Sequence, residues 1–113
     1  MALDCLHDMT RPDLVAAAIR KSITPGGTWF IVDIDSAATP ADNLQNPMAG
    51  MMYAMSLSMC LQSSASTLDG LALGPMGLPE AAMRGLVTAA GFTRFGRVDG
   101  LTHPMNAYYA ARP

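Results

Sequence analysis

The segment that most constrains the fold is 28–34, which reads Thr-Trp-Phe-Ile-Val-Asp-Ile. Its four consecutive apolar residues, of aromatic and β-branched types, predict a β-strand that is buried on both faces. A Pro-Gly-Gly turn precedes it, and a helical pattern precedes the turn. A helix, a tight turn and a buried strand are half of a β-α-β unit, so the sequence predicts the α/β class.

The other half of such a unit is a parallel strand, which would end just before Asp4. Only Met1-Ala2-Leu3 precedes Asp4, so we expect nearly all of this strand to be absent. The strand at 28–34 would then have neighbours on one flank only. It would present an apolar sheet edge, which is a site for pairing with another chain.

The segment before the turn predicts an amphipathic helix. Pro12 fits its first turn, because the missing N–H is not needed there, and Thr10 can cap it. Apolar side chains then recur at helical spacing along one face. These are Val15, Ala18, Ile19 and Ile23.

The middle of the chain predicts one helix between two loops. Residues 36–47 contain Asp, Asn and Pro and predict a polar loop. Residues 48–61 are apolar around the whole helical circumference and rich in methionine, which predicts a buried or pocket-lining helix. Residues 62–77 are rich in Ser and Gly and predict a second loop.

The last third predicts a helix and two strands. The helix begins at Pro79 and ends near Gly91, with one apolar face. Residues 92–98 and 105–111 predict two strands that pair antiparallel. The apolar face of the helix consists of Met83, Leu86, Val87 and Ala90.

Composition narrows the possible partners and the compartment. Charged residues make up 14% of the chain, below the roughly one quarter that is usual in soluble domains, so we infer that something else covers part of the surface. The net charge is −2 and the basic residues are scattered, which argues against nucleic acid. Cys5 and Cys60 form no disulfide framework, which favours a reducing, cytoplasmic setting. We expect no signal peptide and no membrane span, because the apolar stretch at 48–61 is too short.

Four motifs occur in an order that resembles the C-terminal part of a class I S-adenosylmethionine-dependent methyltransferase. The segment 4–9, Asp-Cys-Leu-His-Asp-Met, resembles the one after the fourth strand, which often contains L-H-D-W in O-methyltransferases. The segment 24–33 resembles the L-x-P-G-G turn and fifth strand. The segment 78–92 resembles the helix that ends in A-G-F, and 103–113 resembles the closing strand that ends in R-P. The chain is most similar to bacterial small-molecule methyltransferases with an N-terminal winged-helix region.

The resemblance implies the C-terminal half of a Rossmann-like sheet. It would hold the last part of strand 4 and strands 5, 6 and 7, with two to four helices and with strands 6 and 7 antiparallel. Residues 1–35 would contain the end of strand 4, a helix and strand 5. Residues 36–77 would form the substrate-side region with the Met-rich helix, and 78–113 a helix and the terminal strand pair.

The resemblance also implies S-adenosylmethionine as cofactor and a small molecule as methyl acceptor, with transfer expected at oxygen. The segment 4–9 would lie along the cofactor, so Asp4, Cys5 and Asp8 are the predicted cofactor-binding residues. The glycine-rich loop and the ribose-binding acid of the family do not occur in this sequence. We therefore expect activity to need a complementary N-terminal half or a homo-oligomer.

By the same resemblance, His7 would be the general base that deprotonates a substrate hydroxyl. A histidine titrates near neutral pH, and ligands bind at the carboxyl ends of strands in open α/β sheets. The alternative is a structural histidine that bonds a backbone carbonyl. Asp33 and Asp35 could approach a substrate or a metal, but no histidine has ligand spacing to them. We interpret both as solvated loop residues and expect no metal site.

The Met-rich segment has two interpretations, core packing and the wall of a pocket for a flat or apolar acceptor. In the family this region often forms the substrate wall. The predicted pocket residues are Met52, Tyr53, Met55, Met59 and Asn106.

Two functions therefore stay open. The chain is either the substrate-side part of a methyltransferase or a non-catalytic, truncated remnant that acts as an oligomerisation or interaction module. The exposed sheet edge is the physical argument for the second.

Overall fold

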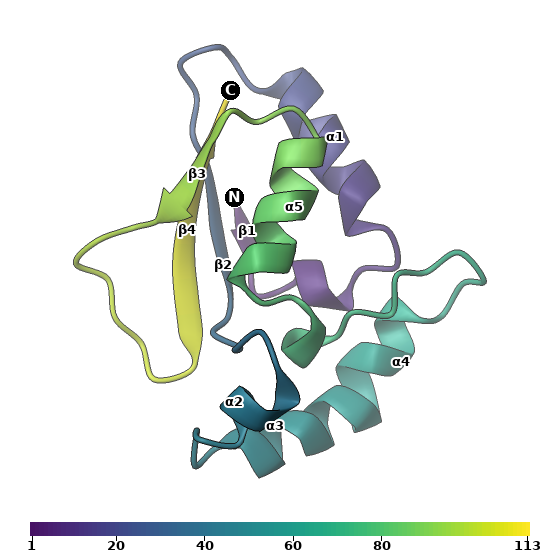
Figure 1. The fold of residues 1–113 in the computed structure, drawn as a ribbon. Coiled ribbons are helices and arrows are strands. Elements are labelled where there is room, and N and C mark those ends of the chain that lie inside the picture. The colour runs from purple at the N-terminus through teal and green to yellow at the C-terminus, as the bar shows by residue number, and fades with distance from the viewer.

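The computed structural model describes residues 1–113 and contains a four-stranded mixed sheet (Figure 1). The strands β1 (Ala2–Leu3), β2 (Trp29–Ile34), β3 (Arg94–Arg97) and β4 (Asn106–Arg112) lie in the order β1-β2-β4-β3. β1 and β2 are parallel, whereas β4 is antiparallel to both β2 and β3. The α/β class, the parallel strand before residue 4 and the antiparallel terminal pair are therefore confirmed.

β1 is short, yet it gives β2 a neighbour on its second flank. Ala2 and Leu3 pair with Ile31 and Val32, and the N–H of Asp4 donates to the C=O of Val32 at 2.8 Å. β4 pairs along the whole of β2 on the other flank. The expectation that β2 has neighbours on one flank only is wrong, because these two residues are enough to pair with its centre.

Helices cover one face of the sheet. α1 (Pro12–Ser22) and α5 (Glu80–Ala89) lie on the same side and contact each other (Figure 1). On the opposite face, which we call the open sheet face, Phe30, Val32 and Tyr108 are half-buried and Leu3 is 57% exposed. The prediction that the strand at 28–34 is buried on both faces is therefore right for the covered face only.

The covered face carries the hydrophobic core. Residues of β2 and β4 that point toward the helices alternate with those of the open sheet face, as the two-residue period of a strand requires. The ring of Trp29 lies 5.5 Å from that of Phe92, and the ring of Tyr109 lies 5.1 Å from that of Phe95. The core cluster comprises Ala2, Leu6, Ala16, Trp29, Ile31, Leu78, Met83, Val87, Phe92, Ala107, Tyr109 and Ala111.

Each of the two helices buries the apolar face that its periodicity predicts, except that in α1 the buried alanine is Ala16 and not Ala18. On α5 the whole predicted apolar face is buried or packed against the core, and Gly91 ends the helix with a φ of +96°. On α1, Ala16 is fully buried and Ala18 is exposed. The helix begins after Arg11, and neither Arg11 nor the predicted cap Thr10 caps it with a side chain.

The middle segment contains more helix than its composition predicts. The expected loop at 36–47 includes α2 (Pro40–Asn43), and the expected loop at 62–77 includes α4 (Leu61–Ser64) and the 3₁₀ turn η3 (Pro75–Gly77). The predicted Met-rich helix is present as α3 (Ala49–Met55) followed by the π-helical turn η2 (Ser56–Cys60). A further 3₁₀ turn, η1 (Leu6–Asp8), follows β1.

Most of the Met-rich segment is exposed. Met52 is buried, but Met51, Met55 and Met59 have exposed fractions of 45%, 44% and 64%. The interpretation of this segment as a core helix is therefore wrong for most of its length. The segment lies beyond the carboxyl end of β2, at the margin of the molecule, where α3 and η2 contact η3 (Figure 1).

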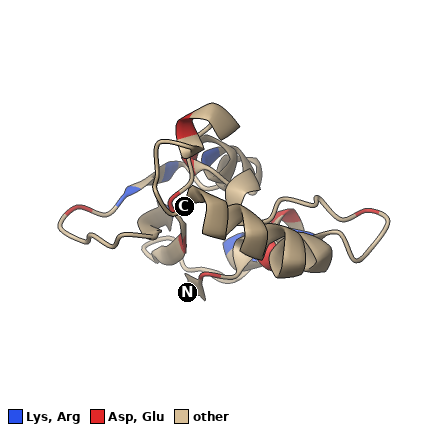
Figure 2. Cartoon of the chain, turned by 90° about the horizontal axis from the view of Figure 1, so that it is seen from below, with Lys and Arg blue, Asp and Glu red and all other residues tan.

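Charged side chains are few, and two arginines each bind two carboxylates. Arg11 binds Asp13 and Asp69, and Arg97 binds Asp35 and Glu80. Figure 2 shows that the basic residues occupy separate parts of the chain and form no continuous stripe. None of the helices has both the length and the apolar character that crossing a bilayer requires.

Gly74 fixes the loop that returns from α4 to η1. Its φ of +62° and ψ of 174° lie in a region essentially reserved for glycine, and an added Cβ would stand 2.7 Å from Ser56 Oγ. We expect Gly74→Ala to lower the free energy of unfolding by about 1–3 kcal/mol, measured by urea denaturation.

The matched control is Gly85→Ala in α5. An added Cβ at Gly85 meets no atom within 4 Å, so the helix propensity of alanine should raise the free energy of unfolding by about 0.5–1 kcal/mol. Equal changes in the two variants would show that the backbone conformation at Gly74 carries no strain.

Candidate functional site

A buried histidine–aspartate pair lies where the parallel strands end. The chain turns at Asp4, whose φ of +53° is unusual for a residue other than glycine, and η1 then carries His7 beneath the end of β2. His7 Nδ1 lies 2.5 Å from Asp33 Oδ1, and the two residues are 3% and 0% exposed. Backbone in a sparsely populated region beside a buried polar pair is typical of functional sites.

The interpretation of Asp33 as a solvated loop residue is wrong. Asp33 belongs to β2 and has the same parity as Trp29 and Ile31, so its side chain points to the covered face of the sheet. That alternation is a sequence signal that could have predicted its burial. Asp35, two residues later, is exposed as expected and forms an ion pair with Arg97 at 2.6 Å.

The carboxylate of Asp33 fixes how His7 is presented. Asp33 Oδ1 accepts a hydrogen bond from Nδ1 and another from the N–H of Ile34 at 2.9 Å. Nε2 is then left free of Asp33 and lies 3.3 Å from Asp8 Oδ1. The structural alternative for His7, a bond to a backbone carbonyl, is therefore not what the structure contains.

Charge around His7 favours its protonated form. Burial lowers the pKa of His7, but the hydrogen bond from its ring to Asp33 and the negative charges of Asp33, Asp8 and Asp4 outweigh burial. The net result is a pKa above the ordinary value of 6.5. Burial raises the pKa of Asp4, although the nearby His7 opposes that shift.

A cavity of about 170 Å³ lies beside this pair. One part of its wall is acidic and contains the histidine, and another part is apolar and rich in methionine. No lysine or arginine lines it. The lining residues are Asp4, His7, Asp8, Ile34, Met52, Met55, Cys60, Pro75 and Met105.

Two of the five predicted pocket residues, Met52 and Met55, line this cavity. Tyr53 instead accepts a hydrogen bond from Asn43 Nδ2 at 3.3 Å, and Met59 is exposed. Asn106 does not line the cavity, but its amide donates to Asp4 Oδ1 at 3.2 Å.

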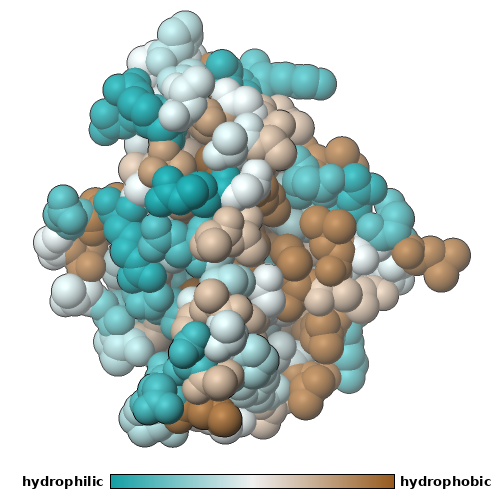
Figure 3. Space-filling view, in the orientation of Figure 1, coloured by the Kyte–Doolittle hydropathy of each residue, from teal (hydrophilic) through white to brown (hydrophobic).

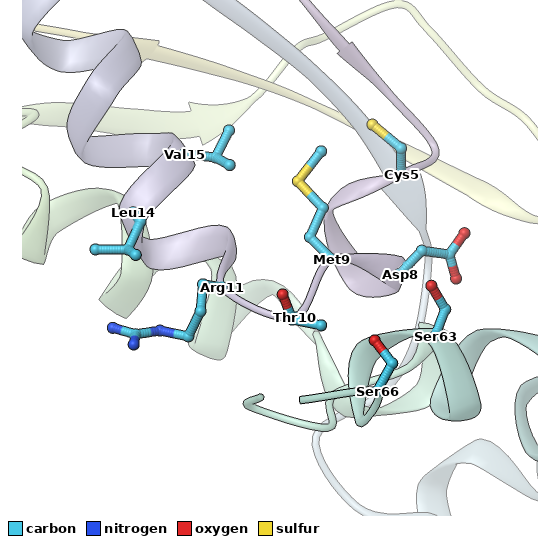
Figure 4. Close-up of a pocket in the computed structure, with 9 residues that line it drawn as sticks. All are labelled: Cys5, Asp8, Met9, Thr10, Arg11, Leu14, Val15, Ser63 and Ser66. Atoms are coloured by element: carbon cyan, nitrogen blue, oxygen red, sulfur yellow. The ribbon is translucent and has the colours of Figure 1, made fainter. Parts of the chain in front are cut away.

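A second, more open hollow of about 680 Å³ lies between η1, the start of α1 and α4 (Figure 4). Two of the predicted cofactor-binding residues, Cys5 and Asp8, line it. The third, Asp4, lines the smaller cavity, and Asp8 belongs to both. The remaining lining residues are Met9, Thr10, Arg11, Leu14, Val15, Ser63 and Ser66.

Cys60 is a site residue that sequence reasoning missed. It comes from η2 and lies with His7 and Asp8 so that one potential ligand atom from each is within 4.8 Å of the others. Burial, and then a hydrogen bond to Asp8, raise the pKa of the Cys60 thiol to about 11. No spacing pattern in the sequence links residue 60 to residues 7 and 8, so only the fold could reveal this cluster.

Two buried oxygens of the site have no hydrogen-bond partner, namely Asp8 Oδ1 and Asp33 Oδ2. Buried polar atoms are normally bonded, so unpaired ones beside a cavity indicate a missing hydrogen-bond donor or cation.

Comparison of the chain with known protein families and with curated proteins finds no match.

Proposed function

We propose that the chain is the substrate-side part of an S-adenosylmethionine-dependent methyltransferase that acts on a hydroxyl of a small molecule. The observation that carries this proposal is the buried His7–Asp33 pair at the carboxyl ends of two parallel strands, beside a cavity. A cavity of about 150 Å³ holds a benzene ring, so one of about 170 Å³ accepts a small aromatic or aliphatic alcohol.

In this proposal His7 Nε2 accepts the proton of the acceptor hydroxyl as the oxygen attacks the methyl group. Asp33 keeps the other proton on Nδ1 and stabilises the imidazolium that forms. Met52 and Met55 hold the apolar body of the acceptor. The bound cofactor supplies the methyl group, and the main task of the protein is to align it with the acceptor oxygen.

The architecture of the sheet supports the proposal. The resemblance implies a strand end, a helix and a parallel strand, followed by a helix and an antiparallel pair, and the observed elements have that order. The open sheet face supports the need for a second part, because half-buried Phe30, Val32 and Tyr108 gain apolar contacts only when another surface covers them. The low content of charged residues agrees with such a covered surface.

Amide NMR spectra of the 113-residue chain test the proposal. Millimolar S-adenosylmethionine should shift the signals of Asp4, Cys5, His7 and Asp8, because weak binding still perturbs the residues that line the cofactor side. Adenosine monophosphate, which lacks the methionine part, is the matched control and should shift them less. Saturable shifts elsewhere, or none at millimolar cofactor, would contradict the assignment of this site.

The second candidate, an interaction module, is favoured by a specific surface. An apolar hollow lies between α1 and α5, and apolar side chains gather on this side of the molecule (Figure 3). Leu14 and Leu71 line the hollow and are 56% and 44% exposed, while Leu68 nearby in sequence is fully exposed. A stable oligomer in size-exclusion chromatography, without cofactor-induced NMR shifts, would favour this candidate over the enzyme.

A further inference from the structure

We propose that His7, Asp8 and Cys60 form a binding site for Zn²⁺, with three protein ligands and a fourth position open to the cavity. An imidazole nitrogen, a carboxylate oxygen and a thiolate are the three ligand types that Zn²⁺ uses in proteins. Three protein ligands with one open position are the arrangement of reactive rather than structural zinc sites. The site stands on metal-binding geometry and does not depend on the proposed methyltransferase function.

The separation of the donor atoms fits a tetrahedral ion. Zn–N and Zn–O bonds of about 2.0–2.1 Å place two such ligands roughly 3.3 Å apart at the tetrahedral angle. His7 Nε2 and Asp8 Oδ1 are 3.3 Å apart. A zinc-bound sulfur should lie about 3.6 Å from the other two atoms, and all three donors lie within 4.8 Å of one another. A zinc-bound state therefore requires Cys60 Sγ to move toward the other two ligand atoms.

The surroundings supply what such an ion needs. Zinc-bound histidines typically donate their second ring N–H to a carboxylate, and His7 Nδ1 makes that bond to buried Asp33. Asp8 Oδ1 accepts no hydrogen bond and lies 3.3 Å from His7 Nε2, so a cation between these two atoms would contact both. The cavity wall contains Asp4 and Asp8 and no basic side chain other than His7. A divalent cation would therefore offset uncompensated negative charge.

A second group of potential ligands, Asp4, His7 and Asp33, is less suitable. His7 Nδ1 and Asp33 Oδ1 lie 2.5 Å apart, which is a hydrogen-bond distance and too short for two ligands of one ion. Asp33 therefore serves as the positioning residue for His7, and Nε2 is the nitrogen that faces the metal.

Two separate segments bring the ligands together. η1 provides His7 and Asp8, and the π-helical turn η2 provides Cys60. π-Helical turns occur frequently at functional sites. On binding, Zn²⁺ forms bonds to Cys60 Sγ and His7 Nε2, and the thiol proton and the Nε2 proton of a protonated His7 are released to the buffer. The open position then takes water or the oxygen or sulfur of a small molecule in the cavity. Zn²⁺ on Nε2 also excludes His7 from accepting a proton there.

Cobalt substitution tests the site in the full chain. One equivalent of Co²⁺ should give the visible bands of a tetrahedral ion and a near-ultraviolet sulfur-to-cobalt charge-transfer band, and Zn²⁺ should displace it. Cys60→Ser should abolish the charge-transfer band, and Cys5→Ser is the matched control that should retain it. A band that persists in Cys60→Ser, a band lost in Cys5→Ser, or the absence of stoichiometric binding would overturn the proposal.

Competition with a chromophoric chelator gives a second measurement. Asp33→Asn should weaken Zn²⁺ affinity by about 10–100-fold, because it removes the carboxylate that orients the imidazole. Asp35→Asn, which lies outside the cluster, should leave the affinity unchanged. Circular dichroism establishes that each variant is folded. Zn²⁺-induced NMR shifts at His7 and Cys60 report metal binding at these residues in the unmutated chain. Equal affinities in both variants would contradict the role of Asp33.

Discussion

Replacing Trp29 with alanine is expected to lower the free energy of unfolding by about 3–5 kcal/mol, the range for removing a large aromatic side chain from a core. Trp29 is 1% exposed, and its ring packs beside that of Phe92 where β2 meets the helices. Its Nε1 has no hydrogen-bond partner, so the substitution leaves no protein group unpaired. The loss therefore reflects packing alone. Urea unfolding followed by circular dichroism measures it without needing the tryptophan.

Two further aromatic substitutions serve as comparisons for Trp29→Ala. Trp29→Phe should cost less than about 1.5 kcal/mol, because it keeps an aromatic ring in the site and removes the unpaired N–H. Phe30→Ala, on the open sheet face, should cost about 1–2 kcal/mol, because Phe30 is only half-buried. A cost for Phe30→Ala as large as that for Trp29→Ala would contradict an open sheet face.

The order of strands and helices followed from local patterns in the sequence. The apolar run before Asp33 specified β2, the glycine at 91 ended α5, and the spacing of Met83 and Val87 specified the buried side of that helix. These features depend on neighbours within a few residues, so periodicity and turn chemistry are enough to predict them. The same local reasoning placed His7 at the end of a strand.

Features that depend on distant contacts were not predictable in this way. The composition of the Met-rich segment predicts a core helix because composition reports hydrophobicity and not location. The fold instead places this segment at the margin of the molecule, where most of its methionines are exposed. The contact between His7 and Asp33 joins residues 26 positions apart, and that of His7 with Cys60 joins η1 to η2. Both contacts depend on how the chain turns at Asp4, which no pattern in the sequence specifies.

The buried pair makes stability depend on pH, and Asp33→Asn should remove most of that dependence. The pKa of His7 is raised in the folded chain above its ordinary value of 6.5, so the protonated form is favoured by folding. The resulting stabilisation is fully present below 6.5 and is lost as pH rises through the folded pKa. In metal-free protein, kept so with a chelator, the free energy of unfolding should therefore fall as pH rises from about 6.

The other titratable groups that face His7 determine whether the pH dependence of stability can be assigned to His7. Asp33 comes from β2, Asp8 from η1, Asp4 from the turn after β1 and Cys60 from η2. Cys60, with a pKa of about 11, titrates far above the ordinary histidine pKa of 6.5. Because the carboxylates favour the charged form of His7, removal of the closest one should have the largest effect.

For Asp33→Asn we expect a loss of about 3 kcal/mol or more near pH 6, because the substitution leaves a buried cation without its hydrogen-bonded partner. Above the folded pKa of His7 the loss should shrink to about 1 kcal/mol, since a neutral imidazole can still donate to the new amide oxygen. Asp35→Asn is the control at the same end of the sheet. Its exposed ion pair with Arg97 should contribute no more than about 1 kcal/mol, with little change in the pH dependence.

NMR titration of the His7 ring separates the pair from the rest of the chain. The His7 ring should titrate above 6.5 in the unmodified protein and at lower pH in Asp33→Asn. Stability that rises with pH across this range, or an unchanged His7 titration in Asp33→Asn, would mean that burial outweighs the carboxylates. The imidazole would then be neutral at physiological pH without help from Asp33, and the positioning role that both proposals give to this aspartate would be lost.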